Sequence, residues 1–140
     1  MITRHEIFNK LDTDVNTQSR PVYMASRFEP VPESFPACYV AEISRRDIQQ
    51  YVNLGFTEYV KMVGWEAQVF SNKITGAVDE AHEIMCDVEA SFKEMKFIET
   101  FCSETPFGDP SIYRIVARFE RVIADADTIE QTQEEIDDGT

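Results

Sequence analysis

The sequence predicts an α+β domain in which a mostly antiparallel β-sheet carries one long helix on a face. Residues 63–70 and 111–123 alternate apolar and polar side chains, the pattern of half-buried strands. Residues 77–95 instead place apolar side chains at the 3.6-residue period of an amphipathic helix. With a short N-terminal helix and further strands, the predicted order of elements is α-β-β-β-α-β-β.

Length and charge limit what the chain can be. At 140 residues we expect one domain, residues 1–123, followed by an acidic tail, residues 124–140. The formal net charge is -13, and the tail holds many carboxylates but no Lys or Arg. This balance argues against a protein that grips duplex DNA or docks on an anionic membrane. The tail is either a solvated terminus or a segment that binds a groove on a neighbouring subunit.

A helix is predicted near the N-terminus. Thr3 and Glu6 have the spacing of a capping box, and Ile7, Phe8 and Leu11 then form an apolar stripe. No signal-peptide core precedes them, and the sequence has no apolar run long enough to cross a membrane.

Extended structure follows this helix. Residues 12–20 are polar and predict a loop, and residues 22–28 are rich in strand formers. Three prolines within residues 29–36 exclude a helix or an inner strand and indicate a stiff connector. Residues 37–45 alternate as a second strand.

Residues 46–64 allow two interpretations. Asp47 could cap a short helix that Gly55 terminates. Alternatively, the stretch is the tip of a long hairpin, which its aromatic and β-branched content favours.

The strands predicted at residues 63–70 and 111–123, together with the long helix, supply the predicted core. Residues 71–76 form a turn before the helix, and residues 97–103 can form a short strand or edge after it. The core candidates, all on the apolar sides of these elements, are Trp65, Ile84, Val88, Phe92, Tyr113, Ile115 and Phe119.

The other side of strand 111–123 mixes charged and aliphatic residues, which suits a surface that another chain covers. The subunit-interface candidates are Arg114, Arg118, Glu120, Phe56 and Tyr59. Exposed ion pairs contribute only about 0–1 kcal/mol each, so the arginines would set register more than affinity.

No motif predicts catalysis, a cofactor or a metal site. His82 and Cys86 are four residues apart on the helix, but a structural zinc needs four ligands and no supporting pattern exists. We therefore interpret them as a surface histidine beside a buried thiol. The three cysteines lack a CxxC and predict free thiols in a reducing compartment. Neither a glycine-rich phosphate loop nor a nucleophile elbow is present, so we expect no enzyme.

Several strings resemble a known family. Val69-Phe70-Ser71-Asn72-Lys73 is similar to a "VYSNK" turn, and Gly76 and Ala81-His82-Glu83-Ile84-Met85 follow at the family's spacing. Pro106, Asp109 and residues 111–119 are similar to its "P…D-x-(T/S)-I-Y-R-I-V-A-R-(Y/F)" strand. This family comprises the tail-terminator or tail-completion proteins of long-tailed bacteriophages, often labelled minor capsid proteins. The resemblance covers about residues 65–123, but Lys96 stands where the family usually has Gly.

The resemblance implies a structural virion protein, made in the host bacterial cytoplasm and located in the tail at the head–tail neck. It implies a homo-oligomeric ring, commonly a homohexamer, that caps the head-proximal end of the tail tube. The ring would end tube polymerisation and join tail to head, with the tail tube protein and head-completion or neck proteins as partners. DNA would only pass through the lumen. The alternatives are a head-completion or neck adaptor nearer the portal, and a cytoplasmic protein-binding module.

Overall fold

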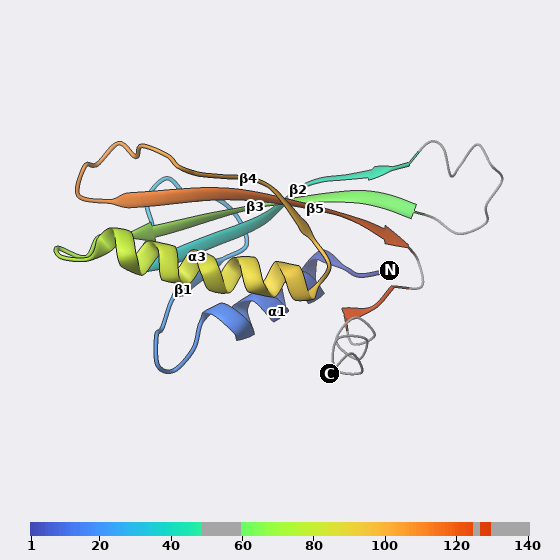
Figure 1. Ribbon diagram of the computed structural model, residues 1–140, viewed down its shortest axis with the longest axis horizontal. Coiled ribbons are helices and arrows are strands. Elements are labelled where there is room, and N and C mark those ends of the chain that lie inside the picture. Colours follow the sequence, from blue (N-terminus) through green and yellow to red (C-terminus); the bar gives the residue numbers. More distant parts are fainter. Residues whose placement is uncertain (49–59, 125–126, 130–140) are drawn as a thin grey trace.

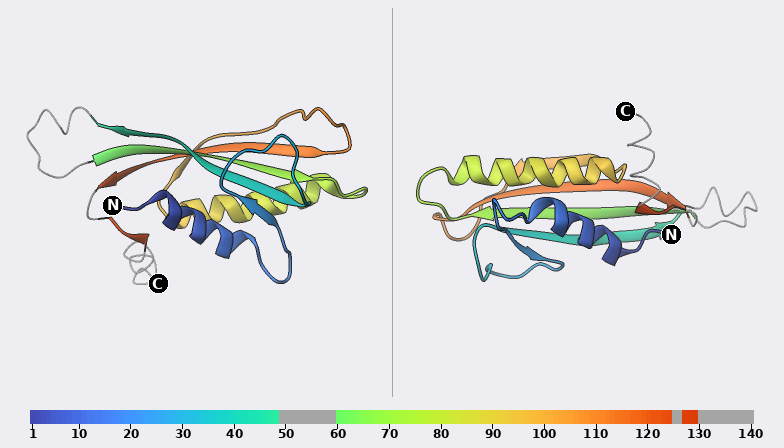
Figure 2. Two further views of the ribbon diagram at one scale, coloured as in Figure 1. Left: turned by 180° about the vertical axis from the view of Figure 1, so that it is seen from behind. Right: turned by 90° about the horizontal axis from the view of Figure 1, so that it is seen from below.

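The computed structural model describes residues 1–48, 60–124 and 127–129 of the chain. Within them, a five-stranded sheet carries two helices on one face, which confirms the α+β class (Figure 1; Figure 2). The elements are α1 (Arg4–Val15), β1 (Tyr23–Ala25), β2 (Ala37–Asp47), β3 (Val60–Ser71), α3 (Ala77–Glu94), β4 (Ile98–Glu104) and β5 (Tyr113–Ala124).

The sheet has the strand order β1-β2-β3-β5-β4. The pairs β2–β3, β3–β5 and β4–β5 are antiparallel, whereas β1 pairs with β2 in parallel. The sheet is therefore mixed. In Figure 1 both described helices lie below the sheet, and neither lies on its upper face.

Local signals predicted the first helix well at its start and less well at its end. The Thr3 side chain accepts a hydrogen bond from the Glu6 amide, and the Glu6 carboxylate accepts one from the Thr3 amide, which confirms the capping box. The helix then continues through part of the predicted loop to Val15, because Val15 is buried in the core.

The segments after α1 also differ from the prediction. Only Tyr23–Ala25 of the predicted stretch 22–28 forms a strand, since only these residues pair with β2. Downstream, β2 extends to Asp47 and pairs there with β3. Residues 49–59, which hold the choice between helix and hairpin tip, lie outside the described residues, as do Phe56 and Tyr59.

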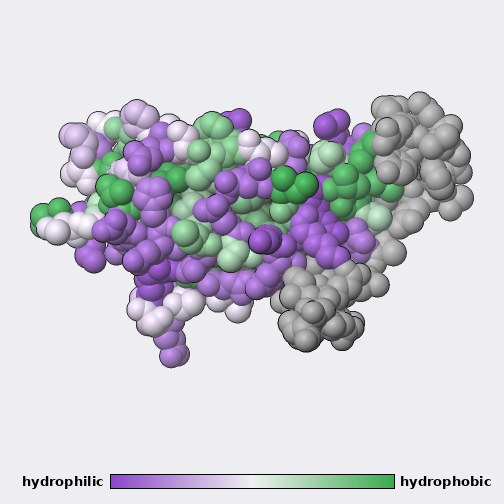
Figure 3. Space-filling view, viewed as in Figure 1, coloured by the Kyte–Doolittle hydropathy of each residue, from purple (hydrophilic) through white to green (hydrophobic). Residues whose placement is uncertain are grey.

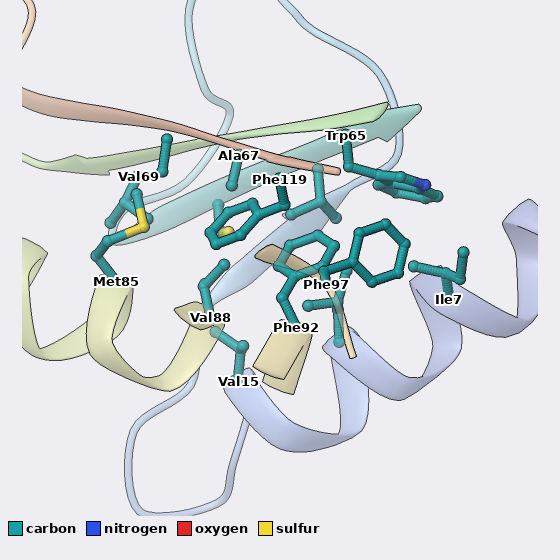
Figure 4. Close-up of a cluster of buried hydrophobic side chains, with 14 of the residues drawn as sticks. Ile7, Val15, Trp65, Ala67, Val69, Met85, Val88, Phe92, Phe97 and Phe119 are labelled. Carbon is teal, nitrogen blue, oxygen red and sulfur yellow. The ribbon is translucent and has the colours of Figure 1, made fainter. Parts of the chain in front are cut away.

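The main core lies between the sheet and the two helices. Its centre is an aromatic group in which Phe92 stacks on Phe119 with ring centroids 4.1 Å apart (Figure 4). Trp65 from β3 and Phe97 from the segment after α3 contact the same Phe92 ring, at 6.2 Å and 5.1 Å. Burial of such side chains stabilises the fold by about 1.5–3 kcal/mol each.

The end of α3 explains how a lysine replaces the expected glycine. Lys96 adopts a left-handed backbone with φ 65°. Its amide donates to the Lys93 carbonyl, and the Phe97 amide donates to the Phe92 carbonyl, both at 2.9 Å. These two bonds form a Schellman motif, and the Phe92–Phe97 ring contact accompanies it. The helix therefore ends at Glu94 although a Cβ in the left-handed conformation of Lys96 carries a steric cost.

A buried lysine joins the two helices. Lys10 of α1 donates to Asp14 and to Glu94 of α3, both at 2.7 Å. Ser91 of α3 also donates to Asp14, at 2.8 Å. Burial lowers the pKa of Lys10, but the hydrogen bonds to the two carboxylates outweigh this and raise it overall. The ammonium group therefore stays charged and holds α1 against α3.

Candidate assembly surface on the open face of the sheet

Within the described residues, the face of the sheet opposite the helices is covered at one end only. There, Tyr39 and Phe70 form a second buried cluster whose ring centroids are 5.0 Å apart. Phe35 from the proline-rich connector and Phe107 from the β4–β5 loop pack against it. The stiff connector predicted from the prolines thus closes this end of the face.

The rest of this face exposes large apolar side chains. Ile43, Ile98, Phe101 and Val122 are 49%, 71%, 45% and 43% exposed. Figure 3 shows apolar surface among hydrophilic surface at the right-hand ends of the strands. We define the open patch by its outward-facing residues, which are Ile43, Gly64, Glu66, Ile98, Phe101, Arg118, Glu120 and Val122.

A charged pair lies at the centre of the open patch. Arg118 of β5 donates through Nε to Glu66 of β3 at 2.9 Å, and Gln68 donates to the same carboxylate at 3.0 Å. The Arg118 guanidinium also lies over the Phe101 ring, 5.6 Å from its centroid. The charge of Arg118 is therefore balanced within its own chain.

The other interface candidates on β5 lie in different surroundings. Arg114 is half-buried, donates to the Pro106 carbonyl at 2.9 Å and lies over the Phe107 ring. It therefore belongs to the covered end of the face. Glu120 is exposed in the open patch, opposite Gly64 on β3.

Gly64 forms the floor of the open patch. A Cβ added there would lie 2.7 Å from the Ser44 hydroxyl and 3.6 Å from Ile43. This close approach accompanies a bulge in β2 between Glu42 and Ser44, which brings Ser44 to the same face as Ile43. The alternation of residues 37–45 puts Ile43 on the same side as Tyr39, but sequence reasoning did not include Ile43 among the interface candidates. It also missed the bulge, although a glycine inside a strand pattern is a recognised sign of one.

Sequence reasoning predicted β4 but not its part in the open patch. The prediction of a short strand or edge at residues 97–103 is confirmed, because β4 is a short strand at the edge of the sheet beside β5. All residues of β4 are exposed, and Ile98 and Phe101 face the open patch. Polar and apolar residues do not alternate regularly in β4, so its sequence does not show which side Ile98 and Phe101 face. Only the order of strands in the sheet brings them to the open patch.

The core candidates lie on the helix-covered side. Trp65, Ile84, Val88, Phe92, Ile115 and Phe119 are buried there, and Tyr113 is partly buried against them. All of them belong to the main core and none to the open patch.

The interpretation of the His82–Cys86 pair is confirmed for His82, which is exposed, and is wrong for Cys86. Cys86 is exposed, because its position on α3 points away from the sheet. His82 lies 3.3 Å from the Tyr113 hydroxyl. Among residues 1–48, 60–124 and 127–129, no group of three or more His, Cys, Asp or Glu side chains could hold a metal ion.

Comparison with known proteins adds no relative: no protein-family model matches the chain, and no curated protein gives a significant match. The resemblance to phage tail terminators accordingly rests on the strings within residues 65–123. In the described part of the chain, neither helix is long and apolar enough to span a bilayer.

Proposed function

We propose that this protein is a structural subunit that assembles with copies of itself into a ring. In line with the sequence resemblance, the ring caps the head-proximal end of a phage tail tube, ends tube polymerisation and joins the tail to the head. The open patch is the observation that carries the assembly part of this proposal.

Apolar exposure supports assembly through this surface. Ile43, Ile98, Phe101 and Val122 gather on one face, each more than two-fifths exposed. A contiguous apolar area framed by polar groups is typical of protein–protein contacts, whereas scattered apolar residues are not. Covering these side chains would remove apolar surface from water at roughly 25 cal/mol per Å².

The distribution of charge also supports assembly through the open patch. The chain carries a net charge of -13, so copies repel one another over most orientations. The open patch instead holds both signs, with Arg118 beside Glu66 and Glu120. A copy that docks there can pair opposite charges, so the contact does not bring carboxylates together alone.

Ring closure follows from the type of contact. If the open patch of one copy meets a different surface of the next, the contact is head-to-tail and closes when its rotation fits a whole number of copies. An acidic ring also repels the phosphate backbone, so DNA passes through its lumen without binding.

The test compares two lysine substitutions at exposed apolar positions. Val122→Lys places a charge in the open patch, and Ile74→Lys places one in the turn before α3, where Ile74 is fully exposed. By sedimentation velocity and electron microscopy, we expect rings for wild type and Ile74→Lys, and monomers for Val122→Lys. Circular dichroism should show all three folded.

Two results would count against the proposal. One is a wild-type protein that stays monomeric at high concentration and in the presence of tail tubes. The other is a ring that tolerates Val122→Lys as well as Ile74→Lys, which would place the subunit contact elsewhere.

A further inference from the structure

Strand β4 is open along one edge as well as on both faces. In the part of the chain that the structure describes, it pairs with β5 alone, and all its residues are exposed. The Thr105 amide donates to the Arg114 carbonyl at 3.0 Å, which sets the phase of the β4–β5 ladder. Because hydrogen-bonded and non-hydrogen-bonded pairs alternate in antiparallel strands, the backbone groups of Cys102 and Glu104 point away from β5. Among the described residues, the Glu104 carbonyl accepts a hydrogen bond from the Ser103 hydroxyl at 3.1 Å. The Cys102 amide and carbonyl and the Glu104 amide remain available to a further strand.

The two sides of β4 differ in chemistry. Ile98 and Phe101 point to the open patch and give that side an apolar character. Glu99, Cys102 and Glu104 lie opposite inward-facing residues of β5 and therefore point to the helix side. A strand added at this edge would meet apolar side chains above the sheet and carboxylates below it.

The helix side is acidic beyond β4 itself. Glu89 of α3 lies close to Glu99, and burial together with a hydrogen bond between these carboxyl groups raises the pKa of Glu99 to about 7. A hollow of about 290 Å³ is lined there by Glu89, Lys93, Phe97, Glu99 and Phe119. A cationic side chain entering from a neighbouring strand would relieve the repulsion between the two carboxylates.

We propose that β4 binds an extended segment of another protein, which adds to the sheet as a sixth strand. The segment carries Lys or Arg at alternate positions, facing Glu99 and Glu104, and apolar residues between them, facing Ile98 and Phe101. This binding goes beyond ring assembly and does not depend on it, because β4 is exposed in the single subunit.

Charge distinguishes this partner from a second copy. Pairing β4 with the β4 strand of another copy would bring the carboxylates of both strands to one side of the sheet. Like charges on neighbouring strands are destabilising, and the net charge of -13 adds to the repulsion. The edge also lacks the usual protection by Lys or Pro, and its bulge lies near one end, between Glu99 and Phe101.

The experiment uses labelled synthetic peptides and fluorescence anisotropy with the full chain. One peptide alternates Lys and Val, a second alternates Glu and Val, and a third has the composition of the first with its lysines in one block. We expect the alternating Lys–Val peptide to bind at least about tenfold more tightly than either control, and more weakly as salt rises.

Two variants that change the net charge by the same amount test whether the peptide binds at β4. Glu99→Lys should weaken binding of the Lys–Val peptide by about fivefold, as expected for loss of one exposed charge pair. Glu33→Lys, in the connector beside the opposite edge of the sheet, should leave binding unchanged. If the two variants weaken peptide binding equally, the binding is a non-specific charge attraction, and the proposal is overturned.

Backbone pairing has its own test. Cys102→Pro removes an outward amide without removing a bond to β5, and should abolish binding. If this variant disrupts β4, nuclear magnetic resonance of the wild type decides, since the amide signals of Cys102 and Glu104 should shift on peptide addition. Unchanged signals would overturn the proposal. So would self-association that competes with the peptide, which would identify a second copy as the occupant of the edge.

Discussion

Replacing Phe92 by Ala should remove the centre of the main core. Phe92 is fully buried and contacts the rings of Trp65, Phe97 and Phe119 (Figure 4). Phe→Ala substitutions in cores cost about 3–5 kcal/mol, and aromatic pairs add about 0.5–1.5 kcal/mol beyond area burial. With three ring partners, we expect a loss of about 4 kcal/mol in the free energy of unfolding. Because domains are stable by about 5–15 kcal/mol, a folded variant remains measurable.

Urea denaturation measures this loss. The only tryptophan, Trp65, reports unfolding by fluorescence from within the core, and circular dichroism provides an independent signal. At a slope of about 2 kcal/mol per molar urea, the midpoint should fall by about 2 M.

Phe101→Ala is the matched control. Phe101 is 45% exposed on β4, so its truncation should cost less than about 1 kcal/mol. If Phe92→Ala costs no more than Phe101→Ala, the aromatic group is not the energetic centre of this fold and the reasoning is refuted.

Three further predictions concern stability. Lys96→Gly should raise the free energy of unfolding by about 1 kcal/mol in urea denaturation, because glycine adopts the left-handed backbone without strain; an unchanged midpoint would contradict this. Lys10→Met should lower it by about 1.5–3 kcal/mol, since Asp14 and Glu94 lose their shared cation, and a stability equal to wild type would refute the role of the link. The raised pKa of Glu99 means that its contribution to stability is fully present below the ordinary pKa of a glutamic acid and is lost as pH rises to about 7. Glu99→Gln should therefore flatten the fall in melting temperature over that pH window, and an unaltered profile would count against the carboxyl pair.

Much of the fold could be predicted because its signals are local. The 3.6-residue stripe of α3, the alternation of β3 and β5 and the capping box at Thr3 each depend on residues close in sequence. The candidate surface was predicted only in part. The mixed face of β5 indicated that Arg118 and Glu120 lie outward, but nothing local indicated that Ile43 or Ile98 joins them.

By itself, the sequence determined which side chains share a face of each helix or strand, since that depends only on the local repeat. The tertiary structure decided which strands are neighbours, and so it alone placed β4 at an edge and set β1 parallel to β2. It also decided that Arg118 pairs with Glu66, a partner far away in the chain. Strand order and register depend on contacts throughout the core between residues that are far apart in sequence. For this reason the open patch and the β4 edge could be recognised only in the folded chain.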